Sequence, residues 1–135
     1  MMKSMILAAG MGTRLRPLTE RMPKCMVAAN GKPIIQHQLE ALETVGIQSC
    51  TIVVGYMAEY LRENIGYCFA GIDISYVEND IYDQTNNIYS LWAARDHLRD
   101  DIILVEGDIL FDQNIFGGAP QIPHIRNIAI VAHFQ

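Results

Sequence analysis

The 135-residue sequence predicts an α/β domain built on a mostly parallel sheet. Short apolar runs of strand length recur along the chain, and segments with apolar residues at helical spacing lie between them. Strands that alternate with helices are usually joined by right-handed crossovers into a parallel sheet. The composition is 50% hydrophobic and 19% charged, which excludes a disordered chain, and the length fits one domain.

The first expected strand covers residues 4–9 and runs directly into a turn that contains two glycines. Pro33 suits the first position of a helix, because its fixed φ is already helical and its missing N–H is not needed there. Apolar residues continue at helical spacing to Val45, and Gly46 is expected to end this helix.

The middle of the chain continues the alternation. Residues 51–54 predict a second buried strand, and residues 58–65 predict a helix that Gly66 ends. Residues 73–77 alternate between polar and apolar side chains, which indicates a third strand.

A polar, turn-rich segment then precedes a third helix, with Asn86 or Asn87 available as its N-cap. We expect this helix to pack on the sheet through an apolar stripe at helical spacing, made of Ile88, Leu91, Trp92 and Leu98. Two further strands are expected at residues 101–105 and 127–132.

The expected topology brings two distant segments together. Ligands bind to such sheets beyond the carboxyl ends of the strands. The turn with Gly10 and Gly12 follows the first strand, and Asp108 follows the strand at 101–105. These residues, about a hundred positions apart, are therefore expected to share one crevice.

Charge is unevenly divided along the chain. Residues 1–32 carry a net charge of +5, whereas residues 33–135 carry −10. An acidic body disfavours nucleic-acid binding, which depends on a broad basic face. The basic opening instead indicates a local site for an anion.

The three cysteines are odd in number and form no C-x-x-C pair, so we expect them to be reduced packing residues. No apolar run approaches the roughly 20 residues that a membrane span requires, and no convincing signal peptide is present. The sequence also contains no N-glycosylation acceptor, and it therefore favours a cytoplasmic protein without membrane contacts.

The sharpest local feature is the segment from Leu7 to Lys24. Gly10 and Gly12 allow backbone N–H groups to approach an oxyanion, and Arg14 and Lys24 add positive charge, which together favour a polyphosphate cradle. The spacing is not that of a P-loop. It also fails the dinucleotide fingerprint, because Leu15 stands where the third glycine is needed.

This segment resembles the signature of the nucleotidyltransferase family, which includes sugar-1-phosphate nucleotidylyltransferases and choline-phosphate cytidylyltransferases. The family pattern is L-A-A-G-x-G-x-R-L, then P-x-T, then P-K, and residues 7–24 keep nearly all of it. The run Gly31-Lys-Pro-Ile-Ile-Gln-His also looks like the family's helix start. The resemblance implies a Rossmann-like three-layer fold that joins a nucleoside triphosphate to a phosphorylated small molecule and releases pyrophosphate.

Two later segments indicate which branch of the family the sequence resembles. Residues 85–92 and 105–111 look more like the choline-phosphate and aminoethylphosphonate cytidylyltransferases than the sugar enzymes. The sugar hallmarks Q-x-x-x-x-G-T and L-G-D are absent. Within residues 85–92, Thr85 and Asn86 precede the helix and are candidates for ligand contact, whereas Ile88, Leu91 and Trp92 are expected to be packing residues.

The resemblance implies a role for each matching residue. The residues implied to hold the nucleotide are Leu7, Ala8, Ala9, Gly10, Gly12, Thr13, Thr85 and Asn86. Arg14 and Lys24 are implied to offset the charge that develops during catalysis. Asp108 follows a buried strand, where a carboxylate can hold Mg²⁺ against triphosphate oxygens, and the family resemblance implies the same role. Two alternatives are left open for Glu106: its side chain faces either this site or a neighbouring backbone amide.

The expected reaction is an in-line displacement, in which a phosphate or phosphonate oxygen of the acceptor attacks the α-phosphorus of CTP. One alternative is a sugar-1-phosphate nucleotidylyltransferase, and another is a non-catalytic nucleotide-binding module. A flavodoxin-like or dehydrogenase domain is disfavoured by the missing third glycine.

The chain stops soon after the strand at 127–132, which suggests a fragment of a longer protein, apparently truncated at its C-terminus. The resemblance implies that a second metal-binding carboxylate and part of the acceptor pocket lie beyond Gln135. The isolated 135 residues are therefore expected to show little or no turnover. An apolar edge strand at 127–132 would also favour association with a second copy, giving a homo-oligomer.

Overall fold

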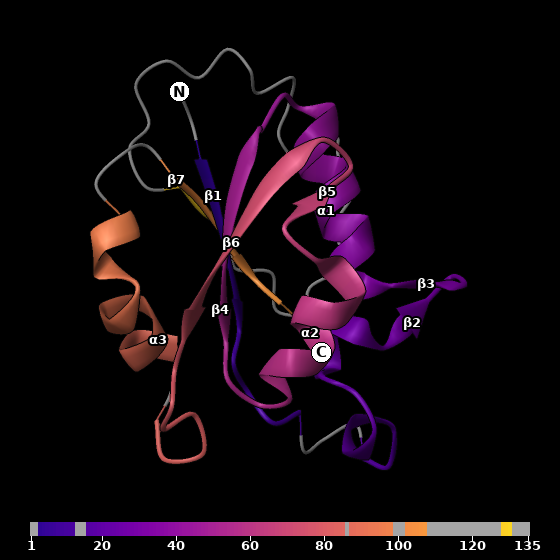
Figure 1. The fold of residues 1–135 in the computed structure, drawn as a ribbon, viewed down its shortest axis with the longest axis vertical. Coiled ribbons are helices and arrows are strands. Elements are labelled where there is room, and N and C mark those ends of the chain that lie inside the picture. Colours follow the sequence, from indigo (N-terminus) through magenta and orange to yellow (C-terminus); the bar gives the residue numbers. More distant parts are fainter. Residues whose placement is uncertain (1–2, 13–15, 86, 99–101, 108–127, 131–135) are drawn as a thin grey trace.

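The computed structural model describes residues 3–12, 16–85, 87–98, 102–107 and 128–130. A mainly parallel sheet forms the middle layer, with α1 (Ile34–Thr44) and α2 (Ala58–Ile65) on one face and α3 (Asn87–Ala93) on the other (Figure 1). The predicted α/β fold with a three-layer arrangement is thus confirmed.

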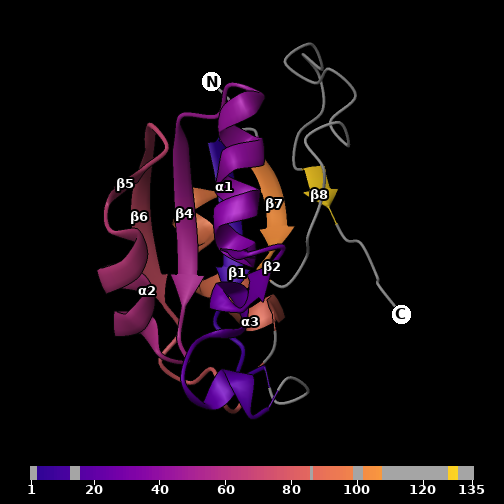
Figure 2. The ribbon, with the colours of Figure 1, turned by 90° about the vertical axis from the view of Figure 1, so that its right-hand side faces the viewer.

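The sheet has the strand order β5-β6-β4-β1-β7-β8, which Figure 2 shows from one edge to the other. Its strands are β1 (Lys3–Ala8), β4 (Ser49–Val54), β5 (Cys68–Phe69), β6 (Ile72–Glu78), β7 (Ile102–Glu106) and β8 (Ile128–Ile130). Every neighbouring pair is parallel except β5 and β6. Leu7 lies opposite Val53 and Glu106, so the carboxyl ends of β1, β4 and β7 meet at one edge of the sheet.

Alternate residues of β1 build two separate cores. Ile6 and Ala8 pack with the buried faces of α1 and α2, whereas Met5 and Leu7 pack with the residues around α3. This burial on both faces is typical of a parallel sheet, and it explains why residues 52–54 of β4 form an unbroken apolar run that is fully buried. The two cores fix the central strands, and with them the edge where their carboxyl ends lie.

The strands predicted at 4–9, 51–54, 73–77 and 101–105 have bounds within two residues of the observed ones, and α2 has its predicted bounds with Gly66 as its C-cap. Of the strand predicted at 127–132, the structure describes residues 128–130 as β8. The prediction for α1 is wrong by one residue, because the helix begins at Ile34 and Pro33 is its N-cap. Pro33 has an extended ψ of 143° because it pairs with Ala28 in a small hairpin of β2 (Ala28–Ala29) and β3 (Lys32–Pro33). Past the other end of the helix, Gly46 has a φ of +91°.

The hairpin is an element that the sequence reasoning missed. Its turn residues are Asn30 and Gly31, both with positive φ, at +52° and +80°. Asn-Gly is the preferred pair for a two-residue turn of this kind, so the signal was present in the sequence. Three short 3-10 helices complete the described structure: η2 (Leu18–Glu20), η3 (Lys24–Met26) and η4 (Arg95–His97).

The expected packing face of α3 is partly wrong. Leu91 and Leu98 pack against the sheet as predicted, but Ile88 is 73% exposed and Trp92 is 56% exposed. The buried positions are instead Ser90 and Ala94, two small residues that let the helix lie close to the strands. The helix is therefore rotated relative to the prediction, and its largest apolar side chains face outward.

All three cysteines are free thiols, as expected, but Cys68 is exposed and is not a packing residue. Cys25 and Cys50 are buried, and burial raises the pKa of the Cys50 thiol to about 12. Among the described residues, no helix combines the length and the apolar character that crossing a membrane would demand.

Candidate functional site

Backbone hydrogen bonds join the carboxyl ends of three strands. The Gly107 N–H, just after β7, donates to the Leu7 carbonyl at 2.8 Å, and the Tyr56 N–H, after β4, donates to the Ala9 carbonyl at 3.1 Å. Gly107 has no space for a side chain, because a Cβ there would lie 2.8 Å from the Leu7 carbonyl oxygen. The loop that begins at Ala9 is therefore held at a fixed place over the sheet edge.

A small crevice of about 130 Å³ opens at this edge, with room for about four water molecules. Its lining residues come from β1, the loop after it, η3 and the end of β7: Leu7, Ala8, Gly10, Lys24, Cys25, Glu106 and Gly107. The crevice therefore brings together four residues predicted to form the site, Leu7, Ala8, Gly10 and Lys24. Its size suits a phosphate group better than a whole nucleotide.

The two glycines of the loop differ in their surroundings. Gly12 has a φ of +63°, and a Cβ on it would lie 2.9 Å from Thr19 Cγ2 and 3.0 Å from Lys24 Cβ. At Gly10, no heavy atom of the part of the chain that the structure describes lies within 4 Å of the place where a Cβ would be. Packing within the protein thus explains Gly12, whereas Gly10 leaves open space beside the crevice.

Two residues that the sequence reasoning did not assign to the site hold the glycine loop. Thr19 is 1% exposed, and its hydroxyl donates to the Gly12 carbonyl at 2.7 Å. The Tyr56 hydroxyl donates to the Thr19 carbonyl at 2.5 Å. Thr19 belongs to the P-x-T part of the motif, so a signal for it existed, but Tyr56 becomes visible only once β4 is placed beside β1.

We expect Tyr56→Phe to lower the free energy of unfolding by about 1 kcal/mol, since the Thr19 carbonyl loses its hydrogen-bond donor. Urea denaturation measures this change. Tyr67→Phe is the matched control. Tyr67 is 66% exposed and directly precedes β5, the outermost strand of the sheet. Equal stability of the wild type and Tyr56→Phe would contradict the role given to this hydroxyl.

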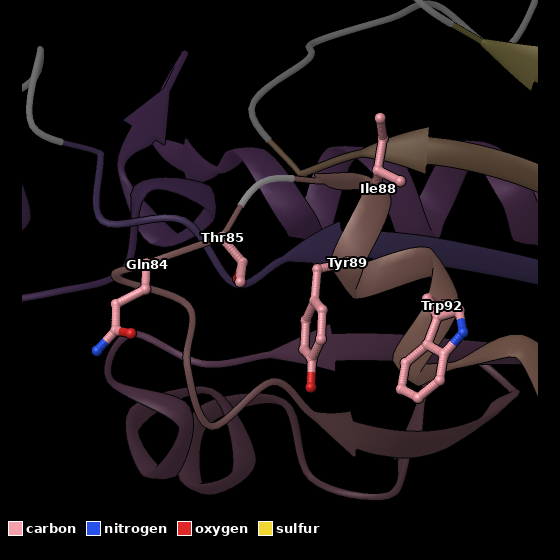
Figure 3. Close-up of a pocket in the computed structure, with 5 residues that line it drawn as sticks. All are labelled: Gln84, Thr85, Ile88, Tyr89 and Trp92. Atoms are coloured by element: carbon pink, nitrogen blue, oxygen red, sulfur yellow. The ribbon is translucent and has the colours of Figure 1, made fainter.

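A second, wider hollow of about 710 Å³ lies beside α3 and is lined by Gln84, Thr85, Ile88, Tyr89 and Trp92 (Figure 3). The Tyr89 and Trp92 rings lie 5.8 Å apart at an interplanar angle of 31°. The Arg95 guanidinium lies 3.9 Å from the centroid of the Trp92 ring. Ile88 and Trp92 thus line a hollow instead of packing in the core.

Thr85 lies at this hollow and not in the crevice. Its hydroxyl donates to the Ile81 carbonyl at 2.8 Å and accepts a hydrogen bond from Asn79 Nδ2 at 3.1 Å. It can accept one further hydrogen bond, but it has no proton left to donate. The predicted nucleotide residues that the structure describes are therefore divided between two regions, the crevice and the hollow beside α3.

Four predicted residues, Thr13, Arg14, Asn86 and Asp108, lie outside the described residues. Glu106, whose position was left open, lines the crevice, and its main-chain carbonyl accepts a hydrogen bond from Gln38 Nε2 at 2.9 Å. Gln38 is fully buried in α1. This bond ties the end of β7 to the helix layer.

A protein-family model described as nucleotidyl transferase matches residues 3–119. The choline-phosphate cytidylyltransferase of Streptococcus pneumoniae is 42% identical over 118 residues, which are 85% of this chain and 48% of that protein. The UTP–glucose-1-phosphate uridylyltransferase AglF of Haloferax volcanii is 38% identical over 114 residues, 84% of this chain and 46% of that protein.

A solved structure of the CTP:phosphocholine cytidylyltransferase from Streptococcus pneumoniae has a TM-score of 0.66 and 42% identity to this chain. The match covers 79% of this chain and 45% of that one. This chain thus spans about half the length of the relatives it matches.

Proposed function

The chain belongs to the nucleotidyl transferase family, and from this premise we propose that it joins CTP to a small phosphorylated or phosphonate acceptor and releases pyrophosphate. The observation that carries the proposal is the crevice at the ends of β1 and β7, which gathers Leu7, Ala8, Gly10 and Lys24. The 42% identity to a choline-phosphate cytidylyltransferase supports CTP and an amine-bearing acceptor. In this proposal residues 1–135 are the nucleotide-binding part of one domain.

The triphosphate is placed with a phosphate group in the crevice and the rest along the glycine loop. The missing side chain at Gly10 lets phosphate oxygens approach the backbone, and Gly12 and Thr13 continue the same loop. Lys24 and Arg14 provide the positive charge that offsets the charge developing on the phosphates. Thr85 and Asn86 hold the nucleoside on the side of α3.

The reaction is one in-line displacement. An acceptor oxygen forms a bond to the α-phosphorus, the bond from the α-phosphorus to the bridging oxygen breaks, and pyrophosphate leaves. Binding and orientation by the loop place the two reactants for this step, and no covalent intermediate with the protein is needed.

Mg²⁺ fits the chemistry of this edge. It is usually bound through one or two carboxylates together with substrate phosphates, and Glu106 lines the crevice while Asp108 follows two residues later. Within the described residues, no group of three or more His, Cys, Asp and Glu side chains could hold a metal ion. Beside the carboxylates, the triphosphate would supply oxygen ligands. The metal supplies charge stabilisation for the leaving pyrophosphate.

In a protein that continues past Gln135, Asp108→Asn is expected to remove most of the Mg²⁺-dependent pyrophosphate release, because the amide keeps the shape of the side chain but loses the charge that holds the metal. Asp73→Asn, exposed at the amino end of β6, is the matched control. The rate is measured as Mg²⁺ is varied. A wild-type rate for Asp108→Asn at limiting Mg²⁺ would show that this residue does not bind the metal.

A panel of acceptors tests the proposed function itself. We expect phosphocholine, 2-aminoethylphosphonate or a similar amine-bearing compound to be used with CTP in preference to glucose-1-phosphate. The 38% identity to a UTP–glucose-1-phosphate uridylyltransferase makes sugar-1-phosphate activation the second candidate. Preference for a hexose-1-phosphate would establish that candidate. Nucleotide binding without turnover on any acceptor, in a protein that continues past Gln135, would favour a non-catalytic module.

A further inference from the structure

Asn79 is the first residue after β6 and is 2% exposed. Its backbone N–H donates to the Val54 carbonyl at 2.8 Å, which places it at the carboxyl edge of the sheet beside the end of β4. A polar side chain this deeply buried is costly unless its hydrogen bonds are made.

The side-chain amide of Asn79 makes three hydrogen bonds, each to a different part of the next segment. Nδ2 donates to Thr85 Oγ1 at 3.1 Å and to Ser90 Oγ at 3.2 Å, while Oδ1 accepts from the Ile81 N–H at 3.1 Å. One residue thus connects the beginning of the loop, its end and the buried face of α3.

These contacts require the chemistry of an amide. Two donors and one acceptor are used at once, and a carboxylate offers acceptors alone while a hydroxyl offers a single donor. Replacement by Asp keeps the size of the side chain and the bond to the Ile81 N–H, but it removes both donors.

The segment that Asn79 holds borders the hollow beside α3. Thr85 and Gln84 lie on the loop, and Trp92 lies on the helix (Figure 3). Of the described residues that line the crevice at Gly10 and Lys24, none is among the side-chain partners of Asn79. The side-chain hydrogen bonds of Asn79 therefore end on the segment beside the hollow. The same loop also packs on Tyr56, whose ring lies 6.1 Å from that of Tyr82, so the affinity for the triphosphate part alone measures whether the glycine loop is affected as well.

We propose that Asn79 is the positioning residue for nucleoside recognition, because it orients Thr85 and the start of α3 without touching the part of the site that holds the triphosphate. This inference rests on the proposed function, in which Thr85 lies on the nucleoside side. Asn79 is buried and lies outside the family motif, and its effect is on the binding of the nucleoside part of the ligand.

The test compares two ligands by isothermal titration calorimetry: CTP, which has a nucleoside, and inorganic tripolyphosphate, which does not. Asn79→Asp is expected to weaken CTP binding by about tenfold, the effect of losing one or two hydrogen bonds, and to leave tripolyphosphate affinity within about twofold of the wild type. Trp92, the single tryptophan, is expected to show a shifted fluorescence maximum, since it lies on the segment that loses its anchor.

Ser4→Ala is the matched control. Ser4 is also 2% exposed and donates to the Ser49 carbonyl at 2.9 Å, but it lies at the amino end of the sheet. It is expected to lower the urea midpoint without changing the affinity for either ligand. Ser90→Ala is a milder variant, to be used if Asn79→Asp does not fold. It removes one of the three hydrogen bonds of Asn79, and a smaller loss of CTP affinity is expected.

The outcomes separate the two proposals. An equal loss of affinity for CTP and tripolyphosphate would make Asn79 a general structural residue and overturn the inference, as would unchanged CTP affinity. Wild-type protein that binds neither ligand would contradict the proposed function, and the inference would fall with it.

Discussion

Lys24→Ala is expected to lower kcat/KM for the nucleoside triphosphate by about two orders of magnitude, the scale seen when one preorganised charge-stabilising group is removed. Lys24 begins η3 and is followed by Cys25, which is 2% exposed, so the backbone on which it stands is anchored in the core. Its stem lies against Gly12, and the residue lines the crevice with Gly10 and Gly107. Lys24 thus lines the crevice from a rigid support.

Lys32→Ala is the matched control for this result. Lys32 forms a salt bridge with Glu40 on α1, away from the crevice, and the hydrogen bond from Lys32 holds the pKa of the Glu40 carboxyl below its usual value. Its loss removes one positive charge of the same basic segment without touching the site. Pyrophosphate release and CTP titration are measured for both variants, and equal behaviour of the two would mean that Lys24 belongs to a merely solvated basic patch.

The fold was predictable because its signals are local and repeated. Apolar runs of strand length alternate with helical spacing, and Gly66 marks the end of α2 correctly. The face of α3 was not predictable in the same way. Ser90 and Ala94 are small, so they add little to a hydrophobic pattern, yet they are the residues that let the helix approach the sheet.

The phosphate side of the site was also predictable, because Leu7, Ala8, Gly10 and Lys24 come from one continuous motif and meet in one crevice. Residues that support this motif come from other parts of the chain. Tyr56 reaches Thr19 from the end of β4, and Asn79 reaches Thr85 and Ser90 from the end of β6. Such contacts depend on strand order and register, which a local pattern does not encode.

The two loop glycines provide the second large expected effect, since the same substitution should act on stability at one and on binding at the other. Gly12→Ala is expected to lower the free energy of unfolding by about 1–3 kcal/mol, because its φ of +63° is strained for alanine and its Cβ would meet Thr19 and Lys24. Gly46→Ala separates these two causes. Gly46 has a φ of +91° but open space around a Cβ, so its variant carries the strain without the contacts.

Gly10→Ala is expected to leave stability within about 0.5 kcal/mol of the wild type, since a Cβ there meets no atom of the described residues within 4 Å. The added methyl group would instead occupy space beside the crevice, where the proposed function places phosphate oxygens close to the backbone. Affinity for tripolyphosphate and for CTP should then fall together, by about tenfold or more, the equivalent of at least one charge-assisted hydrogen bond. Urea denaturation and calorimetry on the same samples measure both quantities. Unchanged affinity in a stable Gly10→Ala protein would show that the open space beside Gly10 is not where the phosphates bind.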